Sequence, residues 1–259
     1  MMKTVILCGG FGTRLREETE FRPKPLVEVG NRPILWHIMK IYEHYGLSDF
    51  VVCLGYRGNM IKDYFLNYDI ANSDFTISLG AGNDVNVHES HNEHFRVTLA
   101  ETGLDTMTGG RIKRIEKYVD SDTFMVTYGD VLADINLGEL LSFHRNHGRL
   151  ATVTVTRPFS RFGMLGIEKD GLVTRFEEKP QLEGWTSAGF FVFDKRVLQK
   201  LGGNDCVLEK DVLPSLARDA ELYAYNHNGF FYAMDTYREY KYLNDLWNNG
   251  AAPWKIWPD

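Results

Sequence analysis

The chain has 259 residues, of which 44% are hydrophobic and 25% are charged, a composition that suits one α/β domain with a sizeable core. Its formal net charge is −6 and no dense basic patch stands out, which argues against nucleic acid as a partner. No apolar run approaches the ~20 residues that span a bilayer, so we expect no membrane segment.

The first predicted element is a short buried strand over residues 3–8, followed by a loop with three glycines in four positions. Glycine lets a loop turn its N–H groups toward an anion, and Arg14 and Lys24 bring two cations to the same stretch. Neither the Walker pattern nor the dinucleotide fingerprint is present, because no Gly-Lys-Ser/Thr follows and Leu15 replaces the third glycine. The stretch from Leu7 to Pro25 therefore predicts a loop that binds the phosphates of a nucleotide.

The next elements alternate between helix and strand. Apolar spacing predicts a helix over 34–42, a buried strand over 50–55 and a second helix over 59–68. His37 on the first of these helices is expected to be a packed or edge histidine rather than a ligand. This order predicts a Rossmann-like α/β fold with a mixed, mostly parallel sheet flanked by helices and with small β insertions.

The pattern then changes to two strands, over 75–79 and 95–99, with a polar segment between them. That segment contains His88, His91 and His94 at a spacing of three, which could align them toward a metal. Its turn-forming residues and its lack of an apolar face favour a solvated loop instead.

The spacing predicts a helix over 108–119 with Thr108 as its N-cap. The start of this helix is either a second site for an anion or a nucleobase edge, or an ordinary capped helix end. The buried strand that follows ends at Gly129 and Asp130. Ligands bind beyond the carboxyl ends of such strands, so Asp130 is a candidate Mg²⁺ ligand rather than the start of a simple turn.

The remaining chain predicts a helix, several strands and a hairpin before a second acidic strand end. A late strand ends at Asp235, and an aromatic-rich helix and tail over 240–257 is expected to serve packing, between subunits or within one. The other elements are a helix over 137–147 ended by Gly148, strands over 151–156, 185–193 and 221–225, a hairpin over 161–176 with its turn at 169–171, and short helices around 209–214.

Several of these stretches resemble the sugar nucleotidyltransferase family. Gly-Gly-Phe-Gly-Thr-Arg-Leu at 9–15 with Pro-Lys-Pro at 23–25 resembles the opening of that family, and the resemblance extends over the chain from Val5 to Lys255. The segment 106–111 is similar to the cytidylyltransferase branch that acts on glucose 1-phosphate. The resemblance implies the nucleotide-diphospho-sugar transferase fold as one domain over 1–259, with a nucleotide-binding part over 1–135, a sugar-binding part over 136–235 and a C-terminal helix and tail over 236–259.

The same resemblance implies transfer of a nucleotidyl group from CTP to a sugar 1-phosphate, giving a CDP-sugar and pyrophosphate with Mg²⁺ as cofactor. It assigns catalytic roles to Arg14 and Lys24, and the metal to Asp130 and Asp235. Nucleotide binding is implied for Leu7, Gly9, Gly10, Gly12, Thr13, Thr106, Gly110, Arg111 and Gly129. Sugar-phosphate binding is implied for Lys179, Glu178 and Ser187.

Three positions depart from the cytidylyltransferase pattern: Thr106 replaces a serine, Val131 a glycine and Ser187 an asparagine. The last two leave open a different sugar 1-phosphate or a different nucleoside triphosphate. A non-catalytic regulator that binds a nucleotide sugar is a further alternative, although the retained pair of carboxylates argues against it. We expect a homo-oligomer, and the three widely spaced cysteines indicate reduced thiols in a cytoplasmic protein.

Overall fold

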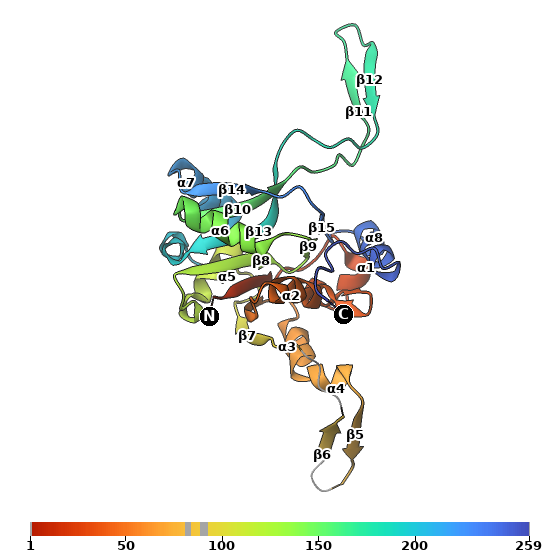
Figure 1. The fold of residues 1–259 in the computed structure, drawn as a ribbon, viewed down its shortest axis with the longest axis vertical. Helices are drawn as coiled ribbons and strands as arrows, with labels where there is room; N and C mark the ends of the chain where they lie inside the picture. Colours follow the sequence, from red (N-terminus) through yellow and green to blue (C-terminus); the bar gives the residue numbers. More distant parts are fainter. Residues whose placement is uncertain (1, 81–83, 89–92, 259) are drawn as a thin grey trace.

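The computed structural model of the chain describes residues 2–80, 84–88 and 93–258 (Figure 1). Its centre is a seven-stranded sheet in the order β14-β10-β13-β8-β1-β4-β7. These strands are β1 (Thr4–Cys8), β4 (Asp49–Leu54), β7 (Arg96–Glu101), β8 (Thr123–Tyr128), β10 (Ala151–Thr156), β13 (Thr186–Asp194) and β14 (Leu222–Asn226).

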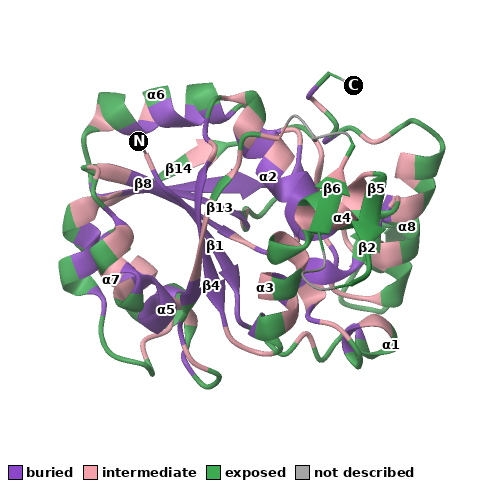
Figure 2. Cartoon of the chain, turned by 90° about the horizontal axis from the view of Figure 1, so that it is seen from below, coloured by how far each residue is buried: buried purple, intermediate pink, exposed green. Residues whose placement is uncertain are grey.

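The sheet is mixed and mostly parallel, as the sequence predicts. Only β13 runs antiparallel to its two neighbours, β8 and β10. The pairs β8–β1, β1–β4, β4–β7 and β10–β14 are parallel. Strands β1 and β4 are buried along their whole length (Figure 2), which explains why they read as continuous β-branched and apolar runs.

Helices cover both faces of the sheet. On one face Ile6 and Val52 pack with α2, α3, α6 and α8, and on the other Val5 and Leu7 pack with α5 and α7. The α-helices are α1 (Arg16–Thr19), α2 (Ile34–His44), α3 (Gly58–Leu66), α4 (Tyr68–Asn72), α5 (Thr108–Arg114), α6 (Leu137–His147), α7 (Leu213–Arg218) and α8 (Tyr237–Asn248). Shorter turns are the 3₁₀-helices η1 (Lys24–Leu26), η2 (Glu116–Tyr118) and η3 (Lys195–Lys200) and the π-helix η4 (Leu208–Val212).

Two helix starts differ from the prediction. Met107 holds the N-cap position of α5, so Thr108 is its first helical residue, and the Thr108 hydroxyl donates to Glu209 Oε2 at 2.7 Å. Helix α8 begins at Tyr237, before the predicted start, because Thr236 and Glu239 form a capping box there.

Two hairpins extend from the body in opposite directions (Figure 1). The first joins β11 (Met164–Ile167) to β12 (Val173–Glu177), as predicted, and we call residues 157–182 the β11–β12 arm. The second pairs β5 (Phe75–Ser78) with β6 (Asp84–Val87), so the prediction of a loop throughout 80–94 is wrong at β6.

Of the three histidines in that polar segment, the structure describes His88 and His94. His88 Nε2 lies 2.8 Å from Thr76 Oγ1, and His91 lies outside the described residues. Among the residues that the structure describes, no group of three or more His, Cys, Asp or Glu side chains could hold a metal.

A small two-stranded ladder brings the two predicted metal ligands to the same place. Strand β9 (Val131–Ala133) pairs antiparallel with β15 (Phe231–Ala233), with Val131 opposite Ala233. The N–H of Met234 donates to the Asp130 carbonyl at 2.9 Å. Asp130 and Asp235 therefore flank one end of this ladder. A similar ladder joins β2 (Glu28–Val29) to β3 (Arg32–Pro33).

The C-terminal tail packs on α2 of its own chain. The fully buried His37 lies 2.7 Å from the Val29 carbonyl through Nε2, and the rings of Trp247 and Trp254 surround it. The prediction of a packed histidine is confirmed. Cys8 and Cys53 are buried, Cys206 is half-buried, and none forms a disulfide. No helix in the described ranges is long and apolar enough to span a bilayer.

Candidate active site

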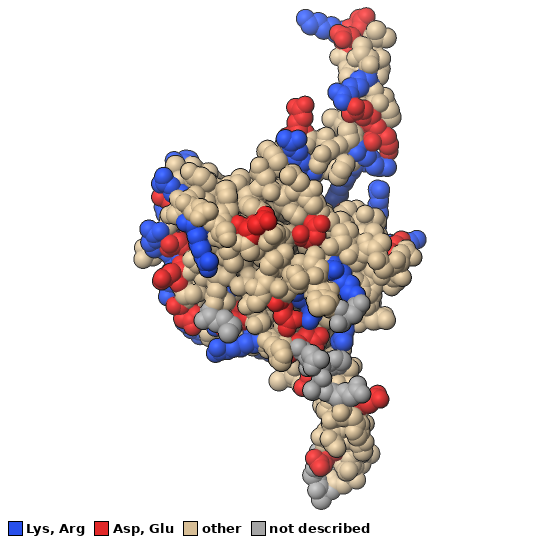
Figure 3. Space-filling model, viewed as in Figure 1, with Lys and Arg blue, Asp and Glu red and all other residues tan. Residues whose placement is uncertain are grey.

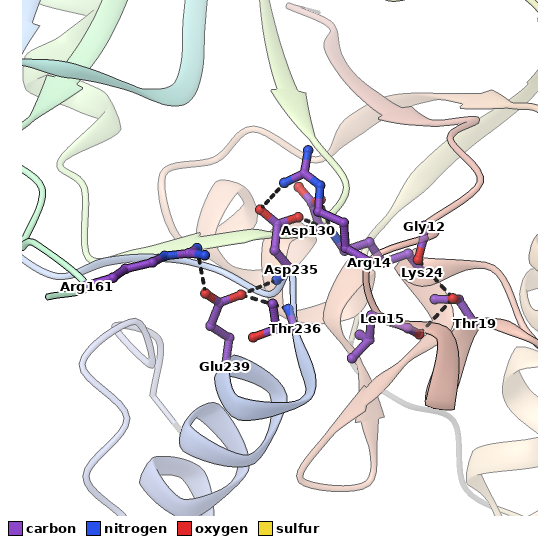
Figure 4. Close-up of polar contacts among 10 residues, drawn as sticks. All are labelled: Gly12, Arg14, Leu15, Thr19, Lys24, Asp130, Arg161, Asp235, Thr236 and Glu239. Carbon is purple, nitrogen blue, oxygen red and sulfur yellow. Dashed lines mark hydrogen bonds and ion pairs between the residues drawn. The ribbon is translucent and has the colours of Figure 1, made fainter.

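The glycine-rich loop follows β1 and is fastened from within the chain. Gly12 has a φ of +65°, in the left-handed region that glycine adopts without strain. The buried Thr19 hydroxyl lies 2.9 Å from the Gly12 carbonyl and 2.7 Å from that of Leu15 (Figure 4). Thr19 thus fixes the loop in shape, although the sequence contains no motif that would single it out.

Two cations of the loop meet two carboxylates from distant parts of the chain. Lys24 Nζ lies 2.5 Å from Asp130 Oδ2 and 2.8 Å from Asp235 Oδ1. Arg14 Nη1 donates to the other oxygen of Asp235 at 2.9 Å (Figure 4). The predicted catalytic and metal-binding residues are thereby brought into direct contact.

The charges in this cluster shift two pKa values in a consistent way. Burial alone would lower the pKa of Lys24, but the carboxylates of Asp130 and Asp235 raise it. Burial would likewise raise the pKa of Asp235, but the hydrogen bond from Lys24 and the charges of Lys24 and Arg14 lower it. At neutral pH Lys24 is therefore an ammonium ion and Asp235 a carboxylate.

A cavity of about 220 Å³ opens over this cluster. It is lined by Leu7, Cys8, Gly10, Gly12, Thr13, Arg14, Lys24, Pro25, Tyr128, Gly129, Asp130 and Asp235. Most of the predicted nucleotide residues of the first loop belong to this lining, together with Gly129 and both aspartates. The cavity lies beyond the carboxyl ends of β1 and β8, where an open α/β sheet binds its ligand.

Tyr128 is a lining residue that the sequence analysis missed. Its hydroxyl hydrogen-bonds to Glu209, and its ring would collide with any Cβ at Gly189, only 2.5 Å from the ring carbon Cδ2. Burial and the Glu209 carboxylate raise the pKa of Tyr128. The available signal was its place at a strand end immediately before Gly129 and Asp130.

Four predicted nucleotide residues do not line the cavity: Gly9 belongs to the loop itself, and Thr106, Gly110 and Arg111 lie behind it. The Arg111 guanidinium is buried, and its Nη2 donates to the Gly9 carbonyl at 3.0 Å. It also donates to the carbonyls of Leu54, Gly103 and Leu104 and to the Thr102 hydroxyl. Thr106 is buried as well, and a Cβ at Gly110 would lie 2.7 Å from the Gly203 carbonyl. The structure thus gives Arg111 contacts that hold the loop backbone from behind.

The predicted sugar-phosphate residues lie outside the cavity lining. Lys179 and Glu178 are exposed on the return leg of the β11–β12 arm, where Lys179 Nζ lies 2.9 Å from Glu178 Oε1. Ser187 lies on β13, and its hydroxyl accepts from the Gly189 N–H at 3.2 Å. Their contact with a sugar stays a prediction.

The acidic pair has the chemistry that a divalent cation requires. Lys24 Nζ binds one oxygen of each aspartate, so both carboxylates already converge on one positive charge. Mg²⁺ is typically held by one or two carboxylates, with phosphates and water completing the shell. Asp130 and Asp235 therefore fit such an ion beside a nucleotide.

The chain matches a protein-family model described as nucleotidyl transferase over residues 3–254. It is 47% identical to glucose-1-phosphate cytidylyltransferase from Salmonella typhi, covering 99% of this chain and 100% of the relative. A probable glucose-1-phosphate cytidylyltransferase from Bacillus subtilis (strain 168) is 45% identical with the same coverage.

Solved structures support the fold at lower identity. HddC from Yersinia pseudotuberculosis has a TM-score of 0.66 at 22% identity, covering 95% of this chain and all of HddC. UDP-glucose pyrophosphorylase complexed with UDP-glucose has a TM-score of 0.68 at 17% identity, covering 96% of this chain and 99% of that one. Family model, full-length relatives and fold agree: the chain belongs to the nucleotidyl transferase family.

Proposed function

We propose that this protein transfers the cytidylyl group of CTP to glucose 1-phosphate, giving CDP-glucose and pyrophosphate. The observation that carries the reaction type is the contact of Arg14 and Lys24 with Asp130 and Asp235 over the phosphate loop. The choice of CTP and glucose 1-phosphate rests on relatives of that activity at 45–47% identity over their full length.

In the proposed reaction a phosphate oxygen of glucose 1-phosphate attacks the α-phosphorus of CTP. A new P–O bond forms there, and the bond from the α-phosphorus to the oxygen bridging to the β-phosphorus breaks, so that pyrophosphate leaves with that oxygen. Arg14 and Lys24 neutralise the charge that grows on the leaving pyrophosphate, and the loop holds the triphosphate in line.

We assign the cofactor Mg²⁺ to Asp130 and Asp235. When bound, the ion neutralises phosphate charge and orients the triphosphate. The two aspartates contribute oxygens that Lys24 now contacts.

In this proposal the two substrates bind to different parts of the chain. The loop from Leu7 to Thr13 binds the nucleotide together with Gly129. Thr106, Gly110 and Arg111 complete or support this nucleotide-binding part. Lys179 binds the phosphate of glucose 1-phosphate, and Glu178 and Ser187 bind the hydroxyl groups of the sugar. The exposed position of Lys179 requires the β11–β12 arm to lie against the substrate when it binds.

We further propose that the protein forms a homo-oligomer. Apolar side chains that a monomer would leave in water are exposed on both hairpins, among them Phe75, Ile77, Leu165, Ile167 and Phe176. The β11–β12 arm carries charges of both signs among uncharged side chains, as expected of a surface that pairs with a second copy (Figure 3). Light scattering after size exclusion tests this proposal, and a monomer mass at micromolar concentration would contradict it.

A substrate panel tests the proposed reaction. Pyrophosphate release is measured for CTP, UTP, GTP, ATP and dTTP, each with glucose 1-phosphate and mannose 1-phosphate, in the presence of Mg²⁺. We expect the highest kcat/KM for CTP with glucose 1-phosphate. A higher value for another pair would show the same chemistry with another substrate, which is the alternative that Val131 and Ser187 motivate.

Asp130→Asn separates an enzyme from a non-catalytic regulator. An asparagine keeps the size of the side chain but removes a charge from the metal pair, so we expect kcat to fall by at least about 100-fold. Binding of CDP-glucose by calorimetry should survive, because the loop is intact. Wild-type protein that binds CDP-glucose but releases no pyrophosphate with any pair would identify a regulator instead.

A further inference from the structure

The carboxylate of Glu239 contacts the backbone that carries Asp235. Glu239 lies in the first turn of α8, and its Oε2 accepts the N–H of Thr236 at 2.8 Å, as in a capping box. The same oxygen also accepts the N–H of Asp235 at 2.7 Å. The second bond goes beyond an ordinary cap and fixes the backbone of the proposed metal ligand.

The other oxygen of Glu239 reaches the β11–β12 arm. Arg161 Nη2 donates to Glu239 Oε1 at 3.0 Å, so Glu239 lies between Asp235 and Arg161 (Figure 4). The Glu239 side chain is only 13% exposed, whereas that of Arg161 is 69% exposed.

Arg161 lies beside the return leg that carries Lys179. At the base of the arm the two legs are bonded to each other: the N–H of Ser160 donates to the Pro180 carbonyl and that of Leu182 to the Pro158 carbonyl, both at 2.8 Å. Phe159 pairs antiparallel with Gln181 between these bonds. Arg161 directly follows Ser160 and Lys179 directly precedes Pro180, so each adjoins one residue of this bonded pair, and a contact that holds Arg161 also restrains the segment that carries Lys179.

We infer that Glu239 is a positioning residue that ties the β11–β12 arm to Asp235 through Arg161. By this link the group proposed to bind the sugar phosphate and the group proposed to hold the metal keep a fixed separation. The inference rests on the proposed function, since it assigns Lys179 to the sugar phosphate and Asp235 to the metal.

A simpler role would be a helix cap joined to a surface ion pair, and such pairs contribute little to stability. The two roles differ in what they predict for kinetics. A cap alone changes stability and leaves the Michaelis constants as they are. A link to the arm raises KM for the sugar 1-phosphate and leaves KM for CTP nearly unchanged, because the phosphate loop is not touched.

The test is a kinetic double-mutant cycle of Glu239→Gln and Arg161→Gln. Glutamine retains one oxygen to accept the Asp235 and Thr236 N–H groups, but it presents an amide to Arg161, so the cap survives and the link is lost. We expect each single variant to raise KM for glucose 1-phosphate about three- to tenfold, with KM for CTP within twofold of wild type. The double variant should be no worse than either single variant, because both remove the same link.

Arg175→Gln is the matched control. Arg175 lies on the same arm, is 70% exposed and pairs with Glu177 within the arm, so its loss should leave both KM values within twofold. Thermal unfolding of each variant is measured beside the kinetics. If Glu239→Gln loses stability, Arg161→Gln alone still tests the link, because it leaves the helix cap unchanged.

Unchanged KM for glucose 1-phosphate in Arg161→Gln would overturn the inference, as would effects that multiply in the double variant. Wild-type protein is measured in the same assay. If wild type releases no pyrophosphate, the proposed function fails; if wild type is active and the variants match it, only the positioning role fails.

Discussion

At the scale of single residues, Lys24 joins the two aspartates of the candidate site. Its ammonium contacts both aspartates, and its side chain is 12% exposed. Without it, two carboxylates would face each other with Arg14 as their remaining cation partner among the described contacts. In the structure Lys24 is therefore the counter-ion of the two aspartates. In the proposed reaction it neutralises charge on the leaving pyrophosphate.

The first prediction concerns Lys24→Gln. Removing the ammonium should let Mg²⁺ bind the aspartates about tenfold more tightly without nucleotide, equivalent to about 1.4 kcal/mol, because a competing positive charge is gone. Turnover should fall about 100- to 1,000-fold, because charge on the leaving group is no longer neutralised. Mg²⁺ titration by thermal shift and calorimetry checks the first effect and pyrophosphate release the second.

Lys169→Gln, in the turn of the β11–β12 arm, is the control for that variant and should behave like wild type in both assays. If Mg²⁺ stabilises neither wild type nor Lys24→Gln, the assignment of the metal to Asp130 and Asp235 is wrong.

At the scale of elements, the glycines of the glycine-rich loop serve different purposes. A Cβ at Gly9 would lie 2.1 Å from Arg111 Cζ, so Gly9 is needed where the guanidinium packs against the loop. A Cβ at Gly10 would meet nothing within 4 Å, although Gly10 lines the cavity. A Cβ at Gly9 would therefore displace the Arg111 guanidinium, while Gly10 leaves space that a ligand can use.

The second prediction compares Gly9→Ala with Gly10→Ala. Gly9→Ala should lower the free energy of unfolding by about 2–4 kcal/mol, because the Arg111 guanidinium must move away from the carbonyls it binds. Gly10→Ala should change it by less than about 0.5 kcal/mol but raise KM for CTP about tenfold. Urea unfolding and steady-state kinetics measure the two effects. Wild-type KM in Gly10→Ala would mean that the triphosphate does not approach this position.

The sequence predicted the elements whose residues carry a local signal. The loop, the strand ends at Asp130 and Asp235 and the turn of the β11–β12 arm all follow from glycines, acids and apolar runs. Strand β6 was missed although Val85 and Val87 alternate with Asp84 and Asn86, because four mostly exposed residues inside a polar, turn-rich segment are too short a signal. The positions of Arg111 and Tyr128 could not be predicted, because the direction of each side chain depends on neighbours far away in the sequence.

At the scale of the whole molecule, the C-terminal tail packs against the core around His37. Burial lowers the pKa of His37 to about 4, against an ordinary value near 6.5. Trp254 Nε1 lies 3.4 Å from its Nδ1, and the Val29 carbonyl lies beside Nε2. The folded protein thus holds a neutral imidazole where α2, α8 and the tail meet.

The third prediction follows from that shift. Because the unfolded chain binds a proton at His37 below about pH 6.5 and the folded chain does not until about pH 4, stability is fully present above pH 6.5 and falls as pH drops through this window. The loss is on the order of 3 kcal/mol. The variant His37→Gln has no titrating group at this position. Its free energy of unfolding should therefore depend less on pH between pH 6.5 and pH 4.

Urea unfolding at pH 7, 5.5 and 4.5 measures the difference between His37→Gln and wild type. His88→Gln on the β5–β6 hairpin is the control, and its profile should parallel that of wild type. Parallel profiles for His37→Gln and wild type would show that His37 does not carry this pH dependence.

The pairing of β9 with β15 also sets when the site can form during synthesis. Asp130 lies near the middle of the chain and Asp235 near its end, and the ladder between these strands places them side by side. Domains generally fold as units as the chain leaves the ribosome. A nascent chain that has not yet reached Asp235 therefore lacks one carboxylate of the pair. The proposed binding of a nucleotide with a metal becomes available only after synthesis has passed Asp235, so shorter nascent chains do not compete for the substrates.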